Sequence, residues 1–140
     1  MRFENKGVLV TGATGGIGRE TCLQFAAEGA AVAVTDLDFA LAERLANEIE
    51  EKGGRAVGYE LDVTNQEQTD AVVNQAATDL GSIDIIFCNA GIREIQPAHQ
   101  LPLDEWRNVI EVNVTGVFVS AQSFAKHCIS ESKPGVIINT

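Results

Sequence analysis

The stretch TGATGGIG, residues 11–18, carries four glycines between an apolar run and a helix-forming segment. Gly12 permits a sharp exit from a strand, Gly16 opens the backbone to a diphosphate, and Gly18 lets a helix pack closely on a sheet. Backbone N–H groups at the start of such a helix lack internal partners and attract an anion. The stretch therefore indicates a phosphate-binding loop. Its spacing is G-x-x-x-G-x-G, not the commoner G-x-G-x-x-G, and a tight turn without a ligand remains an alternative.

Asp36 is a candidate for the acid that binds a ribose. It closes an apolar run 24 residues after the first glycine of the loop, close to where dinucleotide-binding folds place that carboxylate. A carboxylate accepts hydrogen bonds from ribose hydroxyls and repels a 2′-phosphate, and neither Gly15 nor Leu37 supplies a base to offset it. The sequence therefore predicts NAD rather than NADP. A solvated acid at a strand end is the alternative, and Asp38 is a weaker candidate for the same role.

The elements that would position these residues follow a regular alternation. Short runs rich in Val and Ile alternate with longer segments of helical periodicity, which is typical of βαβ units with parallel strands. We expect a single α/β domain over residues 1–140, with helices on both faces of a sheet of about five strands. The expected strands are 7–11, 31–36, 56–63, 83–91 and 134–140, and the expected helices are about 16–28, 39–52, 66–80 and 104–132.

Length and composition restrict the class of protein further. The chain has 140 residues, of which 45% are hydrophobic and 21% charged, and a formal net charge of −10. These values fit one globular domain and disfavour binding to a nucleic-acid backbone. No apolar run spans a bilayer and no signal peptide is visible, so we expect a cytoplasmic protein that binds neither membrane nor nucleic acid. Cys22, Cys88 and Cys128 lack metal-ligand spacing, so we expect no metal site.

Five motifs resemble those of the short-chain dehydrogenase/reductase family, in the same order and spacing over nearly the whole chain. They are TGATGGIG at 11–18, Asp36, LDV at 61–63, NAG at 89–91 and VNVTG at 112–116. The resemblance implies a Rossmann fold, a doubly wound parallel sheet that binds NAD. It implies that the complete enzyme transfers hydride between NAD and a small-molecule alcohol or carbonyl substrate. Because the family usually pairs its long helix and the next one across a dimer, it also implies a homo-oligomer.

The resemblance assigns roles to single residues as well. Asp62 would meet the adenine amino group with the Val63 backbone beside it, although it could instead cap the following helix. In the NAG turn at 89–91, small residues would leave space for a ribose and the Asn89 side chain would bond neighbouring backbone, although a purely structural turn would look the same. The full expected cofactor-binding set is Gly12, Thr14, Gly15, Gly16, Ile17, Gly18, Asp36, Leu37, Asp62, Val63, Asn89, Ala90 and Gly91.

Asn113 is the expected catalytic residue. It lies on the apolar stripe of the expected helix 104–132, where a polar side chain needs hydrogen-bond partners. A buried structural asparagine would meet that need. The resemblance instead makes Asn113 the relay residue that holds a water near an active lysine. The stripe consists of Trp106, Ile110, Val117, Ala121 and Phe124.

The groups that would complete the chemistry are absent from these 140 residues. In the family, the strand that matches GVIINT at 135–140 runs into a serine, then a tyrosine and a lysine in the pattern Y-x-x-x-K. The only tyrosine here is Tyr59, in the expected strand 56–63. We therefore expect a domain that is incomplete at its C-terminus and inactive alone. A non-catalytic dinucleotide-binding module with a regulatory or assembly role is the alternative, and a reading frame that continues past codon 140 would favour the enzyme.

Overall fold

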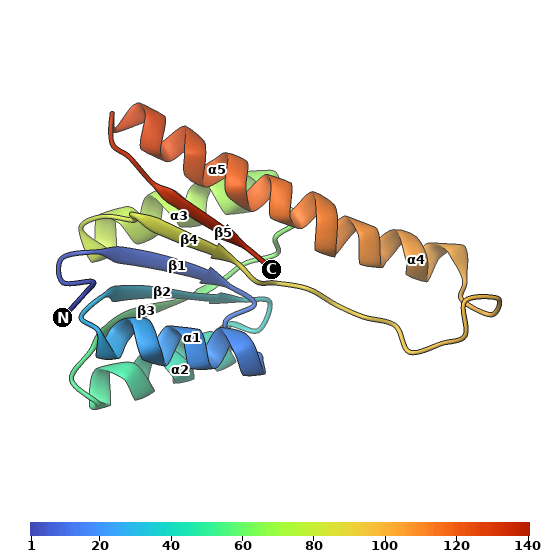
Figure 1. The fold of residues 1–140 in the computed structure, drawn as a ribbon, viewed down its shortest axis with the longest axis horizontal. Coiled ribbons are helices and arrows are strands. Elements are labelled where there is room, and N and C mark those ends of the chain that lie inside the picture. Colours follow the sequence, from blue (N-terminus) through green and yellow to red (C-terminus); the bar gives the residue numbers. More distant parts are fainter.

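A parallel five-stranded sheet organises the computed structural model, which describes all 140 residues. The strand order is β3-β2-β1-β4-β5, with every neighbouring pair parallel (Figure 1). The strands are β1 (Gly7–Thr11), β2 (Ala31–Asp36), β3 (Arg55–Glu60), β4 (Ile85–Cys88) and β5 (Val136–Asn139). The helices are α1 (Gly16–Ala27), α2 (Phe39–Glu51), α3 (Gln66–Leu80), α4 (Leu103–Ile110) and α5 (Gly116–Ser130), with the π-helical turn η1 (Glu111–Thr115) between the last two.

Helices cover both faces of this sheet, so its central strands are apolar on both sides. Helices α1 and α2 lie on one face, and α3 and α5 lie on the other (Figure 1). Successive side chains of a strand point to opposite faces. Val8 and Val10 of β1 therefore join the core under α1 and α2, while Leu9 joins the core that contains Phe124 of α5. The predicted doubly wound fold is confirmed.

Three strands are shorter than the sequence suggested. The strand expected at 134–140 covers only Val136–Asn139. The strand expected at 56–63 ends at Glu60, and the one expected at 83–91 ends at Cys88. β2 ends at Asp36, whose carbonyl accepts the Leu61 N–H at 2.8 Å, so the chain beyond Glu60 has no further strand to pair with. Beyond Cys88, the N–H of Asn89 turns to the Thr11 hydroxyl at 3.0 Å. The motifs LDV and NAG therefore leave the sheet at its carboxyl edge.

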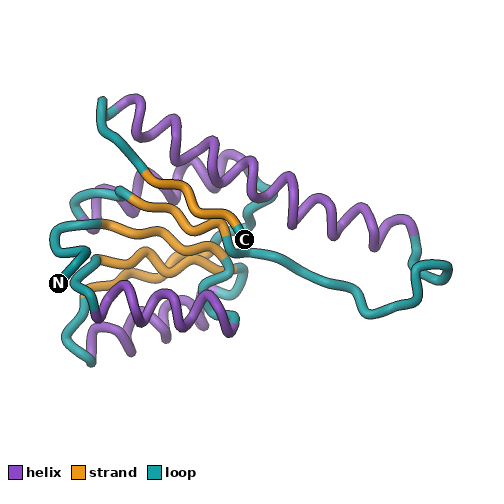
Figure 2. Tube along the Cα trace, in the orientation of Figure 1, coloured by secondary structure: helices purple, strands orange, loops and turns teal.

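The long C-terminal helix also differs from the expectation. The helical segment is continuous from Leu103 to Ser130, two residues short of the expected end, and η1 interrupts its α-helical hydrogen bonding. The prediction of one buried apolar stripe is wrong for the first half, since Trp106 is 52% exposed and Ile110 is 38% exposed, whereas Phe124 is buried. These side chains are exposed because α4 extends past the end of the sheet, alongside the loop that leaves β4 (Figures 1 and 2).

β5 should promote self-association of this chain. It pairs only with β4, and Val136, Ile137 and Ile138 are all exposed. An apolar edge strand with free backbone groups pairs readily with another chain. Despite the net charge of −10, light scattering should therefore detect oligomers whose share grows with protein concentration. A monodisperse monomer at high concentration would contradict this prediction.

Candidate functional site

A cavity of about 830 Å³ opens at the carboxyl edge of the sheet, beside the point where the strand order reverses between β1 and β4. Ligands of open α/β sheets bind at this type of position. The cavity is lined by 17 residues, and every residue that the sequence predicted to bind the cofactor is among them. Sequence reasoning missed the remainder: Leu61, Ile92, Arg93 and Val112.

The loop between β1 and α1 forms one wall of the cavity. Gly12 has a φ of +59°, and a Cβ at this position would lie 2.7 Å from the Cα of Ala90. A Cβ on Gly18 would overlap the carbonyl oxygen of Gly12. A Cβ on Gly16 would meet nothing within 4 Å. Gly12 and Gly18 therefore serve close packing, and Gly16 faces open space.

Helix α1 begins at this open space, and no side chain accepts a hydrogen bond from the backbone N–H groups of its first turn. Gly15 is its N-cap residue and supplies no side-chain hydrogen bond. The first N–H groups of a helix, together with its dipole, attract an anion such as a phosphate. The start of α1 can therefore hold a diphosphate without a basic side chain.

The contrast between Gly18 and Gly16 predicts different effects on stability. Gly18→Ala forces a methyl group against the Gly12 carbonyl and should lower the free energy of unfolding by about 1–3 kcal/mol, as overpacking does. Gly16→Ala adds a methyl group to open space and should change stability by less than about 1 kcal/mol. Urea denaturation of both variants measures the difference. Equal stabilities would contradict the packing role of Gly18.

Asp36 lies at the end of β2, where three donors hold its half-buried carboxylate. Oδ2 accepts the N–H of Thr14 at 2.9 Å and its hydroxyl at 2.7 Å, while Oδ1 accepts the N–H of Leu37 at 2.9 Å. Asp38, the weaker candidate, instead caps α2 by accepting the N–H of Leu41 at 3.2 Å and does not line the cavity. Of the two acids, only Asp36 is available to a ligand there.

Asp62 lines the cavity and follows the end of β3. Its Oδ1 accepts the N–H of Thr64 at 2.9 Å and the hydroxyl of Thr64 at 2.7 Å. The cap of α3 is Asn65, which accepts the N–H of Gln68 at 3.0 Å. The alternative that Asp62 caps this helix is therefore wrong, because Asn65 takes that position, and Asp62 orders the preceding turn.

Asn89 joins β4 to the glycine-rich loop. Its Nδ2 donates to the carbonyl oxygens of Thr11 and Gly12, each at 3.0 Å. The N–H groups of Asn89 and Ala90 both donate to the Thr11 hydroxyl at 3.0 Å. These bonds fix the NAG turn against the loop and keep its small residues beside the cavity.

Asn113 is exposed and lies in η1, outside the cavity lining. The alternative of a buried structural asparagine is therefore wrong. Its need for partners is met by Ile92, whose N–H donates to Oδ1 at 2.8 Å and whose carbonyl accepts from Nδ2 at 2.8 Å. Because Ile92 lines the cavity, Asn113 positions the cavity wall that follows the NAG turn.

The sequence model described as short chain dehydrogenase matches residues 6–140. The chain belongs to the short-chain dehydrogenase family.

Two curated dehydrogenases are similar to this chain in sequence. The 3beta-hydroxysteroid dehydrogenase 1 of Eggerthella lenta is 38% identical over 138 residues, which are 98% of this chain and 53% of the relative. The cyclohexanol dehydrogenase of an Acinetobacter species is 35% identical over 140 residues, which are 99% of this chain and 55% of the relative. The chain thus spans about half the length of the curated relatives it matches.

Two solved structures show the same fold. A short-chain type dehydrogenase/reductase from Mycobacterium marinum superposes with a TM-score of 0.93 at 38% identity, covering 98% of this chain and 56% of that one. An NAD⁺-bound xylitol dehydrogenase superposes with a TM-score of 0.92 at 36% identity, covering 99% of this chain and 54% of that one.

Three other reactive groups lie away from the cavity: Cys22 and Cys88 are buried, and Tyr59 is half-buried. Burial raises the pKa of the Cys22 thiol to about 12 and that of the Cys88 thiol to about 11. Burial and a hydrogen bond to Asp79 raise the pKa of Tyr59. None of these three lines the cavity, and such thiols and phenols stay protonated near neutral pH. No group of three or more His, Cys, Asp or Glu residues could hold a metal ion.

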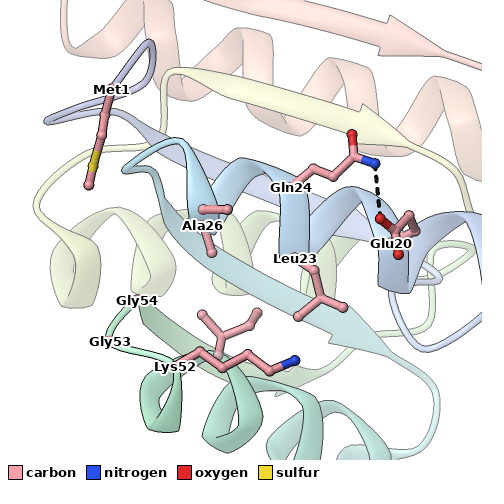
Figure 3. Close-up of a pocket in the computed structure, with 10 residues that line it drawn as sticks. Met1, Glu20, Leu23, Gln24, Ala26, Lys52, Gly53 and Gly54 are labelled. Atoms are coloured by element: carbon pink, nitrogen blue, oxygen red, sulfur yellow. Dashed lines mark hydrogen bonds between the residues drawn. The ribbon is translucent and has the colours of Figure 1, made fainter.

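A second hollow of about 400 Å³ lies between α1 and α2 (Figure 3). Its wall includes Met1, Ile49 and Gly54, which precedes the amino end of β3, so it opens at the opposite edge of the sheet. Two of its polar side chains satisfy each other, since Gln24 donates to Glu20 at 2.9 Å (Figure 3). This hollow has no helix N-terminus or strand-end acid.

None of the helices has both the length and the apolar character needed to cross a membrane.

Proposed function

We propose that residues 1–140 form the NAD-binding portion of an oxidoreductase that transfers hydride between NAD and a small-molecule alcohol or carbonyl substrate. One observation carries this proposal: a single cavity joins the open N-terminus of α1 to the Asp36 carboxylate. A diphosphate needs the first and a ribose needs the second. The NAD⁺-bound xylitol dehydrogenase, with a TM-score of 0.92, supports the same cofactor.

The residues around the cavity fit such a cofactor from one end to the other. Asp62 and Val63 would hold the adenine, Asp36 its ribose, and the N–H groups at the start of α1 the diphosphate. The turn 89–91 would leave space for the second ribose, and Asn113 would keep the adjoining wall in place through Ile92. NAD, when bound, supplies the hydride acceptor.

The charges around the cavity support NAD over NADP. The Asp36 carboxylate is fixed by three donors and would repel a 2′-phosphate. Arg93 is the only basic side chain in the lining, and it follows β4, whereas Asp36 ends β2 on the other side of β1. No base therefore stands beside Asp36 to neutralise a 2′-phosphate.

The proton that leaves an alcohol during oxidation needs a base. The lining residues include no tyrosine, lysine, histidine or cysteine, so this portion supplies cofactor binding and not proton transfer. Relatives named for a 3beta-hydroxysteroid, for cyclohexanol and for xylitol support an alcohol as the substrate class. A protein of this kind would act in the cytoplasm.

The exposed row on the long helix supports a homo-oligomer. Trp106, Val114 and Phe118 are 52%, 58% and 61% exposed, and with Leu103 and Ile110 they recur at helical spacing along one side of α4, η1 and α5. Exposed apolar rows of this length are typical of helix-to-helix contacts between subunits. A second copy of this chain would bury them.

Gly16→Asp tests the proposed function through the diphosphate. Its side chain would enter open space, and an acid at the start of a helix does not destabilise it. The parent chain should bind NAD in calorimetry with one site, whereas Gly16→Asp should lose at least about tenfold in affinity through charge repulsion. Gln24→Glu, which adds a negative charge at an exposed helical position of the second hollow, is the control and should bind like the parent. A parent chain that binds no NAD would overturn the proposal.

A further inference from the structure

Gly116, the first residue of α5, does not need to be a glycine for the sake of its backbone conformation. Its φ of −61° and ψ of −37° are those of an ordinary right-handed helix, in which glycine is less favourable than alanine. What requires a glycine is space, because a Cβ at this position would lie 2.6 Å from Cγ2 of Val63. Both residues are buried. The missing side chain therefore lets the start of α5 pack directly on Val63.

Val63 also lines the cavity, next to Asp62. Its β-branched side chain has few alternative χ1 rotamers with which to avoid an added methyl group. The turn that carries both residues is firmly bonded to the start of α3. The N–H of Asp62 donates to Oε1 of Gln68 at 2.9 Å, and its carbonyl accepts the N–H of Asn65 at 3.0 Å. A displacement of Val63 would therefore carry Asp62 with it.

The helical side of this contact is held in place as well. η1 ends one residue before Gly116, and its Asn113 forms two hydrogen bonds of 2.8 Å with the backbone of Ile92. Ile92 and Val112 both line the cavity. The contact between Gly116 and Val63 therefore joins two walls of the cavity, and its closeness sets how far apart these walls lie.

Resting on the proposed function, we propose that Gly116 is a positioning residue for the adenine end of the cavity. It touches no ligand and acts through Val63, whose place against α5 fixes where the Asp62 carboxylate lies. Both donors from Thr64 go to Oδ1 of Asp62, so Oδ2 is available to the amino group of adenine. The close packing at Gly116 thus determines how well the chain distinguishes adenine from a base without that amino group.

The test compares NAD with nicotinamide hypoxanthine dinucleotide, in which a carbonyl oxygen replaces the amino group of adenine, by calorimetry. The parent chain should bind NAD about three- to tenfold more tightly, because the carbonyl oxygen has no hydrogen to donate to Asp62. Gly116→Ala overpacks the contact and Val63→Ala leaves a gap in it, so each single variant should lose most of this preference. The double variant carries an alanine methyl group on each side of the contact and should regain the preference.

Gly135→Ala is the matched control. A Cβ at this position would lie 2.6 Å from Cζ of Phe124, so the change also presses a methyl group against α5. Neither Gly135 nor Phe124 lines the cavity, and the variant should keep the parent's preference for NAD. The preference is a ratio of two affinities, so a partly unfolded sample, which lowers both affinities equally, leaves it unchanged.

The outcomes separate this inference from the proposed function. The inference is overturned if Gly116→Ala keeps the preference for NAD, if Gly135→Ala loses it as well, or if the double variant does not regain it. Val63→Ala decides the question where Gly116→Ala does not fold, since a retained preference in that variant also overturns the inference. A parent chain that binds both dinucleotides equally overturns the inference alone. A parent chain that binds neither overturns the proposed function together with it.

Discussion

The 140-residue chain should bind NAD and form no NADH above background when mixed with secondary alcohols. Binding the cofactor does not by itself lower the chemical barrier, because only interactions that strengthen in the transition state do so. A positioned acid or base typically contributes about a hundred- to ten-thousandfold to rate. No tyrosine, lysine or histidine lines the cavity, and the amide of Asn113 does not ionise near neutral pH.

The measurement is the absorbance of NADH over a panel of cyclic and steroid alcohols. A complete family enzyme, such as the cyclohexanol dehydrogenase from Acinetobacter, serves as the positive control in the same assay. Turnover by residues 1–140 that disappears in Asn113→Ala would contradict the prediction and indicate a different chemistry. A chain that binds NAD tightly and never turns over, even when joined to the second part of a family enzyme, would favour a non-catalytic module.

Asp36→Ala should weaken NAD binding about ten- to a hundredfold. A hydrogen bond to a charged group contributes roughly 1.5–3 kcal/mol. Asp36 ends β2 and is the acid that lines the cavity there. The same variant should bind NADP better relative to NAD, because the repulsion of a 2′-phosphate is gone. Calorimetry with both cofactors measures the two constants and their ratio.

Asp38→Asn is the matched control for that change. It removes a charge two residues away but keeps a side-chain oxygen that can accept the N–H of Leu41 and cap α2. Asparagine is as good an N-cap residue as aspartate, so the variant should stay folded and bind NAD like the parent. An Asp36→Ala chain that binds NAD as tightly as the parent would show that Asp36 does not hold the ribose.

The sequence predicted the fold and most of the residues that line the cavity, because both depend on strongly patterned segments. Apolar runs and helical periodicity determine the order of elements, and parallel strands bring their carboxyl ends to one edge. Gly12, Asp36 and Asn89 each follow or end a strand, so their gathering at that edge follows from the order of elements alone.

Other features depend on what surrounds a segment in space, and the sequence predicted them poorly. The stripe through Trp106 and Ile110 has the period of a buried helix, yet α4 extends beyond the sheet and stays exposed. The periodicity of 104–132 gave no sign of the π-helical turn η1 at Asn113. Ile92 and Arg93 follow the NAG motif in a loop without periodicity, so only the folded chain places them in the cavity wall.

The central claim is that a dinucleotide occupies the cavity at the carboxyl edge of the sheet. The most direct test is a titration of the ¹⁵N-labelled chain with NAD, followed by the amide resonances. The account predicts shifts for the loop from Gly12 to Gly18, for Asp36 and for the turn 89–91, with no change at Gly53 in the hollow between α1 and α2. Shifts confined to the second hollow, or no shifts at all, would contradict it.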